Sequence, residues 1–242
     1  MNKVFKENTA SISEIKKICL EEIFRQKTII YNKCVMHRQN TIRNGKKIYL
    51  RPITYIDLPI SSVRFVEAVG KYLYSLKEKN KYEVLCGIAT QGIPYVYAAS
   101  QRYNIPAIYA RTKQQSYGTN SYISGKLNLN SKILIVDNLI YSGETMNLVI
   151  DKVLDNGMII TGLCTVVKFE TSFNKLKDNY PLYYLITVQE IYDYLIVRNY
   201  FPKPLEKYIR LFIKDQTLFH AESDLYKEYL NTLGDLKLLW RT

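Results

Sequence analysis

The stretch ILIVDNLIYSGET (residues 133–145) joins an apolar strand pattern to a turn and the start of a helix. Four apolar residues precede Asp137, which sits where the predicted strand ends and can accept hydrogen bonds from sugar hydroxyls. Ser142, Gly143 and Thr145 open the helix, whose first N–H groups and positive dipole end suit a phosphate. The stretch therefore predicts a site for a phosphorylated sugar, or the remains of one.

The pattern repeats outward from this stretch. Further apolar strands are predicted at residues 82–89, 106–111, 158–169 and 182–187, and they alternate with predicted helices, including 62–79, 145–157 and 188–196. Strands that are apolar throughout and alternate with helices indicate an α/β fold with a mostly parallel sheet flanked by helices. Ligands bind outside the carboxyl ends of such strands, so we expect the site in loops 89–93, 112–125 and 137–145.

Three segments follow from this pattern: a helical, basic segment at 1–40, an α/β domain at 41–198 and a helical extension at 199–242. The first contains a predicted helix over 10–30, capped by Ser11 or Ser13. Residues 41–53 predict a hairpin that turns at Asn44-Gly45. The extension predicts two amphipathic helices, which either pack on the domain or dock a partner.

The net charge of +12 is concentrated at the start of the chain, where residues 1–50 hold 11 Lys and Arg against 4 Asp and Glu. This region either binds nucleic acid or another polyanion, or is a solvated face. The four cysteines form no CxxC pair and there are only two histidines, so we expect no metal site built from these residues. Without a signal peptide or an apolar run of about 18 residues, we expect a cytoplasmic protein.

Four motifs in order resemble the type I phosphoribosyltransferases, and the orotate phosphoribosyltransferases in particular. They are NTIRNGKKIYLRP (40–52), GIATQGIPYVYAASQRYNIPAIYAR (87–111), KILIVDNLIYSGET (132–145) and NYPLYYLITVQEIYDYL (179–195). The resemblance covers roughly residues 40–196 and implies that family's fold with a small N-terminal hood. It also implies a homodimer, because orotate enzymes pair so that a loop reaches the neighbouring site.

The resemblance further implies transfer of ribose 5-phosphate from 5-phosphoribosyl 1-pyrophosphate (PRPP) to a base, with Mg²⁺. By position in the motifs, Asp137 and Asn138 hold the ribose hydroxyls, and Gln91 and Gly92 meet the pyrophosphate. The catalytic residues are Asp137, Arg111 and Lys113, and the base-binding residues are Lys168 and Lys47. Ser142, Gly143 and Thr145 match the loop that binds the 5-phosphate in the family.

Several positions depart from the family pattern. Asn138 replaces the second of two adjacent acids, and Glu144 brings a carboxylate to the phosphate loop unless it points outward or caps the helix. Thr112, Gln115 and Tyr117 stand where the family has Lys, Lys and His. These changes predict weakened stabilisation of the leaving pyrophosphate.

We therefore predict an orotate phosphoribosyltransferase-like protein with weakened or lost catalysis, which acts as a ligand-binding or assembly component. By family analogy, one such role is a nucleic-acid-associated part of an anti-phage system of the retron type, with a nucleic-acid or protein partner at the basic N-terminus and C-terminal helices. The alternative is an active PRPP-dependent phosphoribosyltransferase acting on orotate or another base.

Overall fold

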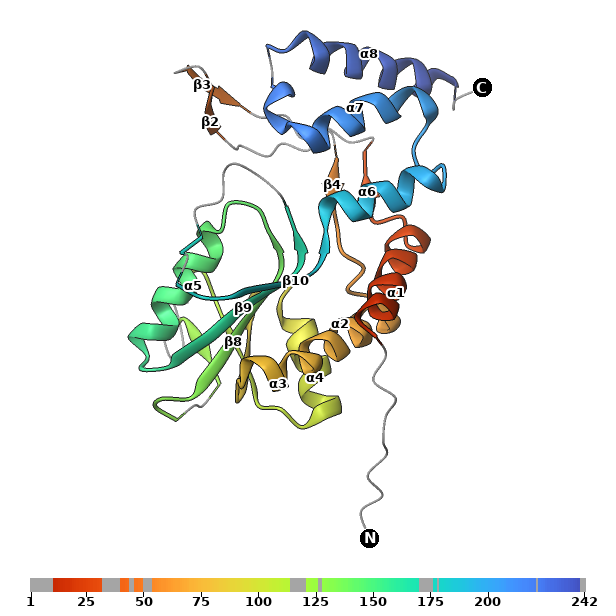
Figure 1. Cartoon of the computed structure of the whole chain (residues 1–242). Coiled ribbons are helices and arrows are strands. Elements are labelled where there is room, and N and C mark those ends of the chain that lie inside the picture. Colours follow the sequence, from red (N-terminus) through yellow and green to blue (C-terminus); the bar gives the residue numbers. More distant parts are fainter. Residues whose placement is uncertain are drawn as a thin grey trace. The chain divides into compact units, whose positions relative to one another are not determined.

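The chain divides by its contacts into two units, each assembled from two separate stretches. Unit 1 contains Met1–Glu22 and Pro59–Val188, and unit 2 contains Ile23–Leu58 and Gln189–Thr242. The computed structural model describes residues 11–31, 40–43, 46–49, 54–113, 121–125, 128–169, 176–177, 179–220 and 222–239 (Figure 1). These units cut across the segments 1–40, 41–198 and 199–242, which stay predictions as domain boundaries.

Unit 1 is built on a six-stranded sheet with the order β10-β9-β8-β5-β6-β7. Every neighbouring pair is parallel except β6 and β7, which are antiparallel. The strands are β5 (Val84–Ile88), β6 (Ala107–Ala110), β7 (Ile123–Ser124), β8 (Lys132–Ile140), β9 (Ile159–Lys168) and β10 (Leu182–Thr187). All five residues of β5 are buried, as expected for a strand covered on both faces. The predicted α/β class is confirmed.

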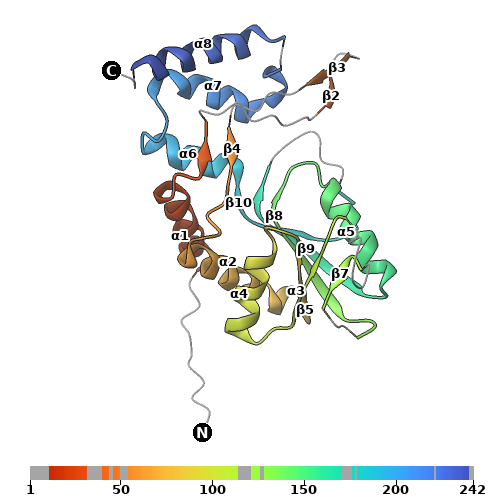
Figure 2. The same ribbon diagram turned by 180° about the vertical axis from the view of Figure 1, so that it is seen from behind.

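Helices cover both faces of this sheet (Figures 1 and 2). On one face, α5 (Glu144–Asp155) buries Met146, Val149, Ile150 and Val153 in a core shared with β5 and β8. The other face carries α2 (Val63–Ser75) and α4 (Ile93–Tyr103), with the short α3 (Lys77–Asn80) beside them. Ser62 caps α2 by accepting the Phe65 N–H at 3.2 Å.

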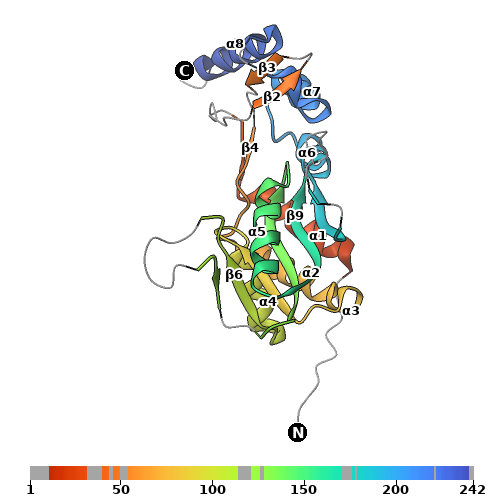
Figure 3. The ribbon, with the colours of Figure 1, turned by 90° about the vertical axis from the view of Figure 1, so that its left-hand side faces the viewer.

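Unit 2 combines residues 23–58 with the C-terminal stretch that begins at Gln189 (Figure 3). It has two strand pairs, β1 (Ile29–Ile30) with β4 (Tyr55–Ile56) and β2 (Asn40–Arg43) with β3 (Lys46–Tyr49). Most of α6 (Val188–Val197) belongs to it, together with α7 (Lys203–Lys214), the 3-10 helix η1 (Gln216–Leu218) and α8 (Asp224–Leu239). The Tyr200 hydroxyl donates to the Ile29 carbonyl at 3.0 Å, and the Tyr229 hydroxyl donates to the Tyr31 carbonyl at 2.5 Å. The C-terminal helices therefore pack on β1 and its neighbours.

Most predicted elements form, with shifted limits. The predicted helix over 10–30 is wrong at its end, since α1 (Ile12–Arg25) stops early and residues 29–30 form β1. Lys27 has a φ of 51° and breaks the helix before the β-branched run from Thr28. Ser11 is the cap of α1: it accepts the Glu14 N–H at 3.2 Å, and its own N–H donates to Glu14 at 2.7 Å. The loop predicted over 112–125 contains β7, and the hairpin turn Asn44-Gly45 lies outside the described residues.

Candidate functional site at the carboxyl ends of β5 and β8

The loop after β5 is folded tightly against the sheet. The Gly92 N–H donates to the Ile88 carbonyl at 2.9 Å, and the Ala89–Thr90 peptide bond is cis. A Cβ on Gly92 would lie 2.6 Å from the Val136 carbonyl oxygen and 2.7 Å from backbone atoms of Ile88. The sequence analysis predicts that this glycine lets pyrophosphate approach the backbone. In the structure, the neighbouring backbone of Ile88 and Val136 already requires a glycine here. Its φ of −73° is ordinary, so the requirement is space rather than conformation.

Asp137 lies inside β8 rather than at its end, because β8 continues to Ile140 and pairs Asp137 with Thr165 of β9. The residue is only 9% exposed, and one carboxylate oxygen accepts the Asn138 N–H at 2.8 Å. Burial raises the pKa of Asp137 to about 7, against a smaller opposing effect of that hydrogen bond. The group thus titrates near neutral pH, as carboxyls at functional sites often do.

Asn138 connects β8 to the loop after β5. Its amide Nδ2 donates a hydrogen bond to the Gln91 side-chain oxygen. The two predicted ligand-binding loops are therefore in direct contact through a pair of neutral amides, at the position where the family pattern has a second acid. Sequence spacing alone gives no sign of this bond, because the two residues are 47 positions apart.

The loop from Tyr141 to Thr145 turns the chain from β8 into α5. Gly143 precedes the helix with a φ of +80°, and a Cβ there would lie 3.0 Å from the Leu176 side chain and 3.1 Å from its backbone. Both features require glycine. The first turn of α5 leaves N–H groups without intrahelical acceptors, which is the arrangement that receives phosphates.

Glu144 is exposed in the first turn of α5. An acid in this position interacts favourably with the positive end of the helix dipole. Of the alternatives left open by the sequence, an outward-facing Glu144 agrees with this exposure. The carboxylate in the loop is therefore compatible with a phosphate at the backbone N–H groups.

Arg111 closes the β6–β7 pair instead of extending freely from it. Its guanidinium donates to the Ser124 hydroxyl at 2.6 Å and to the Tyr109 hydroxyl at 2.7 Å, and lies 4.6 Å from the Tyr109 ring centroid. The hydrogen bond with Ser124, together with the nearby guanidinium, lowers the pKa of Tyr109. Lys113 is exposed, whereas Gln115 and Tyr117 lie outside the described residues. The sequence identified Arg111 but not its partners.

The two predicted base-binding lysines belong to different units. Lys168 ends β9 in unit 1, and its ammonium lies 4.8 Å from the centroid of the Tyr184 ring on β10. Lys47 lies on β3 in unit 2, and its side chain is outside the described part of the structure. Base binding by these residues stays a prediction.

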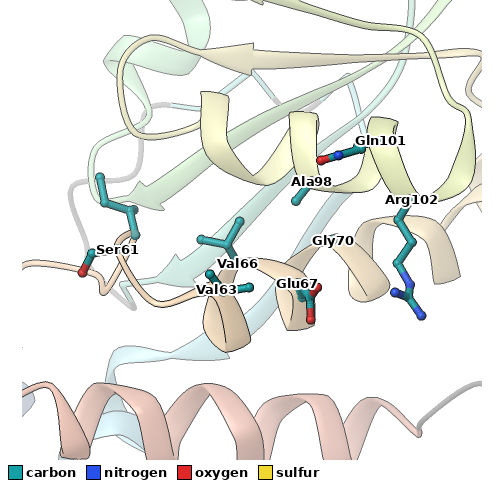
Figure 4. A pocket seen from close by; sticks show the side chains of 9 residues that line it. Ser61, Val63, Val66, Glu67, Gly70, Ala98, Gln101 and Arg102 are labelled. Carbon is teal, nitrogen blue, oxygen red and sulfur yellow. The ribbon is translucent and has the colours of Figure 1, made fainter.

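A separate cavity of about 480 Å³ lies between α2 and α4 (Figure 4). Gly70 and Ala98, where the helices approach closely, line it together with Val63 and Arg102. None of the predicted site residues lines it. The candidate site stays at the loops that follow β5 and β8, two of the three loops in which the sequence predicts it.

The described residues contain no group of three or more His, Cys, Asp or Glu side chains able to hold a metal ion. Each helix in the described part of the chain is too short or too polar to cross a membrane.

Comparison with known proteins identifies the family. The domain family described as "Phosphoribosyl transferase domain" matches residues 62–195, more than half of the 242-residue chain. An orotate phosphoribosyltransferase from Cytophaga hutchinsonii is 28% identical over 123 residues, which is 49% of this chain and 58% of that protein. One from Malacoplasma penetrans is 25% identical over 116 residues, covering 47% and 56%. The chain thus spans less than two thirds of these relatives.

Solved structures show the same fold. The UMP synthase of Leishmania donovani superposes with a TM-score of 0.63 at 17% identity, covering 85% of this chain and 43% of that one. The orotate phosphoribosyltransferase of Mycobacterium tuberculosis in complex with Fe(III) dicitrate gives 0.56 at 17% identity, covering 74% and 98%. With the loops after β5 and β8 arranged as described, the chain belongs to the phosphoribosyltransferase family.

Proposed function

We propose that this protein binds PRPP or a related 5-phosphoribosyl ligand and turns it over weakly or not at all, so that it acts as a ligand-binding or assembly component. The observation that carries the proposal is the hydrogen bond from Asn138 to Gln91. It uses a neutral amide to join the two ligand loops at the place where a second carboxylate would face a developing cation.

The binding half of the proposal rests on the residues around α5. The N–H groups at its first turn and the hydroxyls of Ser142 and Thr145 would hold a 5-phosphate, and Gly143 provides the positive φ with which the chain turns into the helix. Asp137 would accept hydrogen bonds from ribose hydroxyls. A magnesium ion would be held mostly by the phosphates of the ligand, with Asp137 and Asn138 as the nearby oxygen donors.

The weakened-catalysis half rests on charge. Transfer of ribose 5-phosphate develops a cation at the sugar and a highly charged pyrophosphate, and fixed charges must stabilise both. Asp137 is the single carboxylate at the place where the family pattern has two adjacent acids. Its pKa near 7 leaves part of it protonated at neutral pH. The Arg111 guanidinium is engaged by Ser124 and Tyr109, so it is directed at the strand pair rather than held ready for pyrophosphate.

The test is titration calorimetry with PRPP, with and without Mg²⁺, beside an assay of PRPP consumption with orotate. We expect PRPP to bind and Asp137→Ala to abolish binding, while Asp155→Ala, an exposed acid at the far end of α5, leaves it unchanged. Asn138→Asp should raise turnover. Absence of binding at about millimolar PRPP would contradict the binding half, since working ligand affinities lie at or below this range. Turnover within the usual enzyme range of about 1–10³ s⁻¹ would instead establish the alternative, an active phosphoribosyltransferase.

The homodimer, the cytoplasmic location and the place in an anti-phage system stay predictions of the sequence.

A further inference from the structure

The second candidate surface lies on α7 in unit 2 and shares no residue with the proposed phosphoribosyl site. One face of α7 is buried, through Leu205, Tyr208, Ile209 and Phe212. Its four cations are all exposed: Lys203, Lys207, Arg210 and Lys214. At 3.6 residues per turn these four positions fall within an arc of about 60° on the side opposite the buried residues. The helix therefore presents a straight cationic stripe, defined by these four residues.

The stripe is almost free of acids. Glu206 is the one acid on α7, and its side chain is only 16% exposed, where it pairs with Lys203 at 3.1 Å. Lys207 pairs with Glu228 of α8 at 2.7 Å, and both side chains are more than half exposed. Such exposed pairs contribute little and exchange readily for another anion. Among the described residues, no ion pair joins Arg210 or Lys214.

The contrast with α8 shows that this is more than an ordinary solvated face. Solvated faces usually mix charges of both signs. The exposed residues of α8 do so, with Lys227 beside Asp224 and Glu228. The α7 stripe is of one sign, and residues 23–58 of the same unit add eight Lys and Arg against one acid, Asp57. Positive charge is thus gathered in unit 2, both along the chain and on one helix face.

We propose that the α7 stripe binds the phosphate backbone of double-stranded nucleic acid without regard to sequence. The stripe runs about 16 Å along the helix axis, the length of about five phosphates on one strand of a duplex. Tyr208 and Phe212 of α7 are buried, so the described stripe offers no aromatic ring for the base stacking on which single-strand binders rely. A membrane surface would need an exposed apolar face, and the apolar face of α7 is already packed.

The test is fluorescence anisotropy with a labelled duplex of mixed sequence over a series of salt concentrations. Four phosphate contacts predict a log–log salt slope of about −3.6. Arg210→Gln with Lys214→Gln should weaken binding about tenfold and make the slope shallower by about 2. The matched control, Lys17→Gln with Lys227→Gln, removes the same charge from exposed positions on α1 and α8 and should bind as the unmodified protein does.

Three outcomes would overturn the proposal: no duplex binding at low salt, equal weakening by the control pair, or tighter binding of a single strand of the same sequence. Binding of a labelled acidic protein without binding of the duplex would also overturn the proposal and assign the stripe to a protein partner. Unchanged thermal midpoints in both double variants would show that the effects arise at the surface rather than from loss of fold. The outcome is independent of PRPP binding, since no residue is shared with that site.

Discussion

At the candidate site, the surroundings of a side chain determine its protonation and contacts as much as its own chemistry does. The sequence predicts Asp137 as a site carboxylate. In the structure the residue lies inside β8, where it is buried beside the fully buried Thr165. A carboxylate in such surroundings loses hydration, and one hydrogen bond from Asn138 does not compensate for this loss. The residue type was visible in the sequence, whereas its protonation was not.

The raised pKa of Asp137 predicts how the free energy of unfolding depends on pH. Its folded pKa of about 7 lies above the unfolded value of about 3.9. Between these values the folded state retains a proton that the unfolded chain has lost, so the free energy of unfolding falls as pH rises from about 4 to about 7. We expect this group to cost about 2–4 kcal/mol above pH 7.

Asp137→Asn, which keeps an oxygen for the Asn138 N–H, should remove that part of the pH dependence and be the more stable protein at pH 8. Urea denaturation of both proteins across this pH range measures it. Parallel curves for the two proteins would show that Asp137 ionises in the folded state as it does in water.

At the scale of elements, the same residue type has different roles in a loop and in a helix. Gly92 lies where the loop after β5 meets the backbones of β5 and β8, and a Cβ there would contact atoms that cannot move aside. Gly234 lies within α8, where a Cβ would meet nothing within 4 Å. The sequence shows two glycines, and the packing decides which of them is required.

The two glycines therefore predict opposite effects. Gly92→Ala should destabilise the protein by more than about 2 kcal/mol, because the clash is with carbonyl and amide groups of the sheet. Gly234→Ala should stabilise it by about 0.5–1 kcal/mol, because alanine is the better helix former. Chemical denaturation of both variants tests the pair, and equal effects would contradict the close approach at Gly92.

At the scale of the whole molecule, the division into units differs from the order of the sequence. The chain passes between the units three times, and the C-terminal helices pack in the same unit as residues 23–58. Aromatic contacts mark that packing, including Tyr31 with Phe201 at 5.4 Å and Tyr208 with Tyr229 at 5.7 Å between ring centroids. Of the alternatives left open for these helices, packing within the chain is observed for their apolar faces, and docking of a partner stays a prediction.

Ending the chain after Asn199 should expose this aromatic packing. A pair of two-residue strands is not stable by itself, so we expect the amides of Ile29–Ile30 and Tyr55–Ile56 to lose protection in hydrogen exchange. The amides of β8 and β9 in unit 1 should keep theirs. Retained protection in β1 and β4 would show that unit 2 does not depend on its C-terminal helices.

The sequence by itself determined the class of fold and predicted the place of the candidate site. Apolar runs such as residues 133–136 that alternate with amphipathic helices indicate a sheet covered on both faces, and a glycine turn such as Ser142-Gly143 after a strand is local information. The tertiary structure decided what depends on residues far apart in the chain: the bond between Gln91 and Asn138, the clash that requires Gly92, and the burial that raises the pKa of Asp137. Periodicity shows which face of an element is buried, but not which other element buries it.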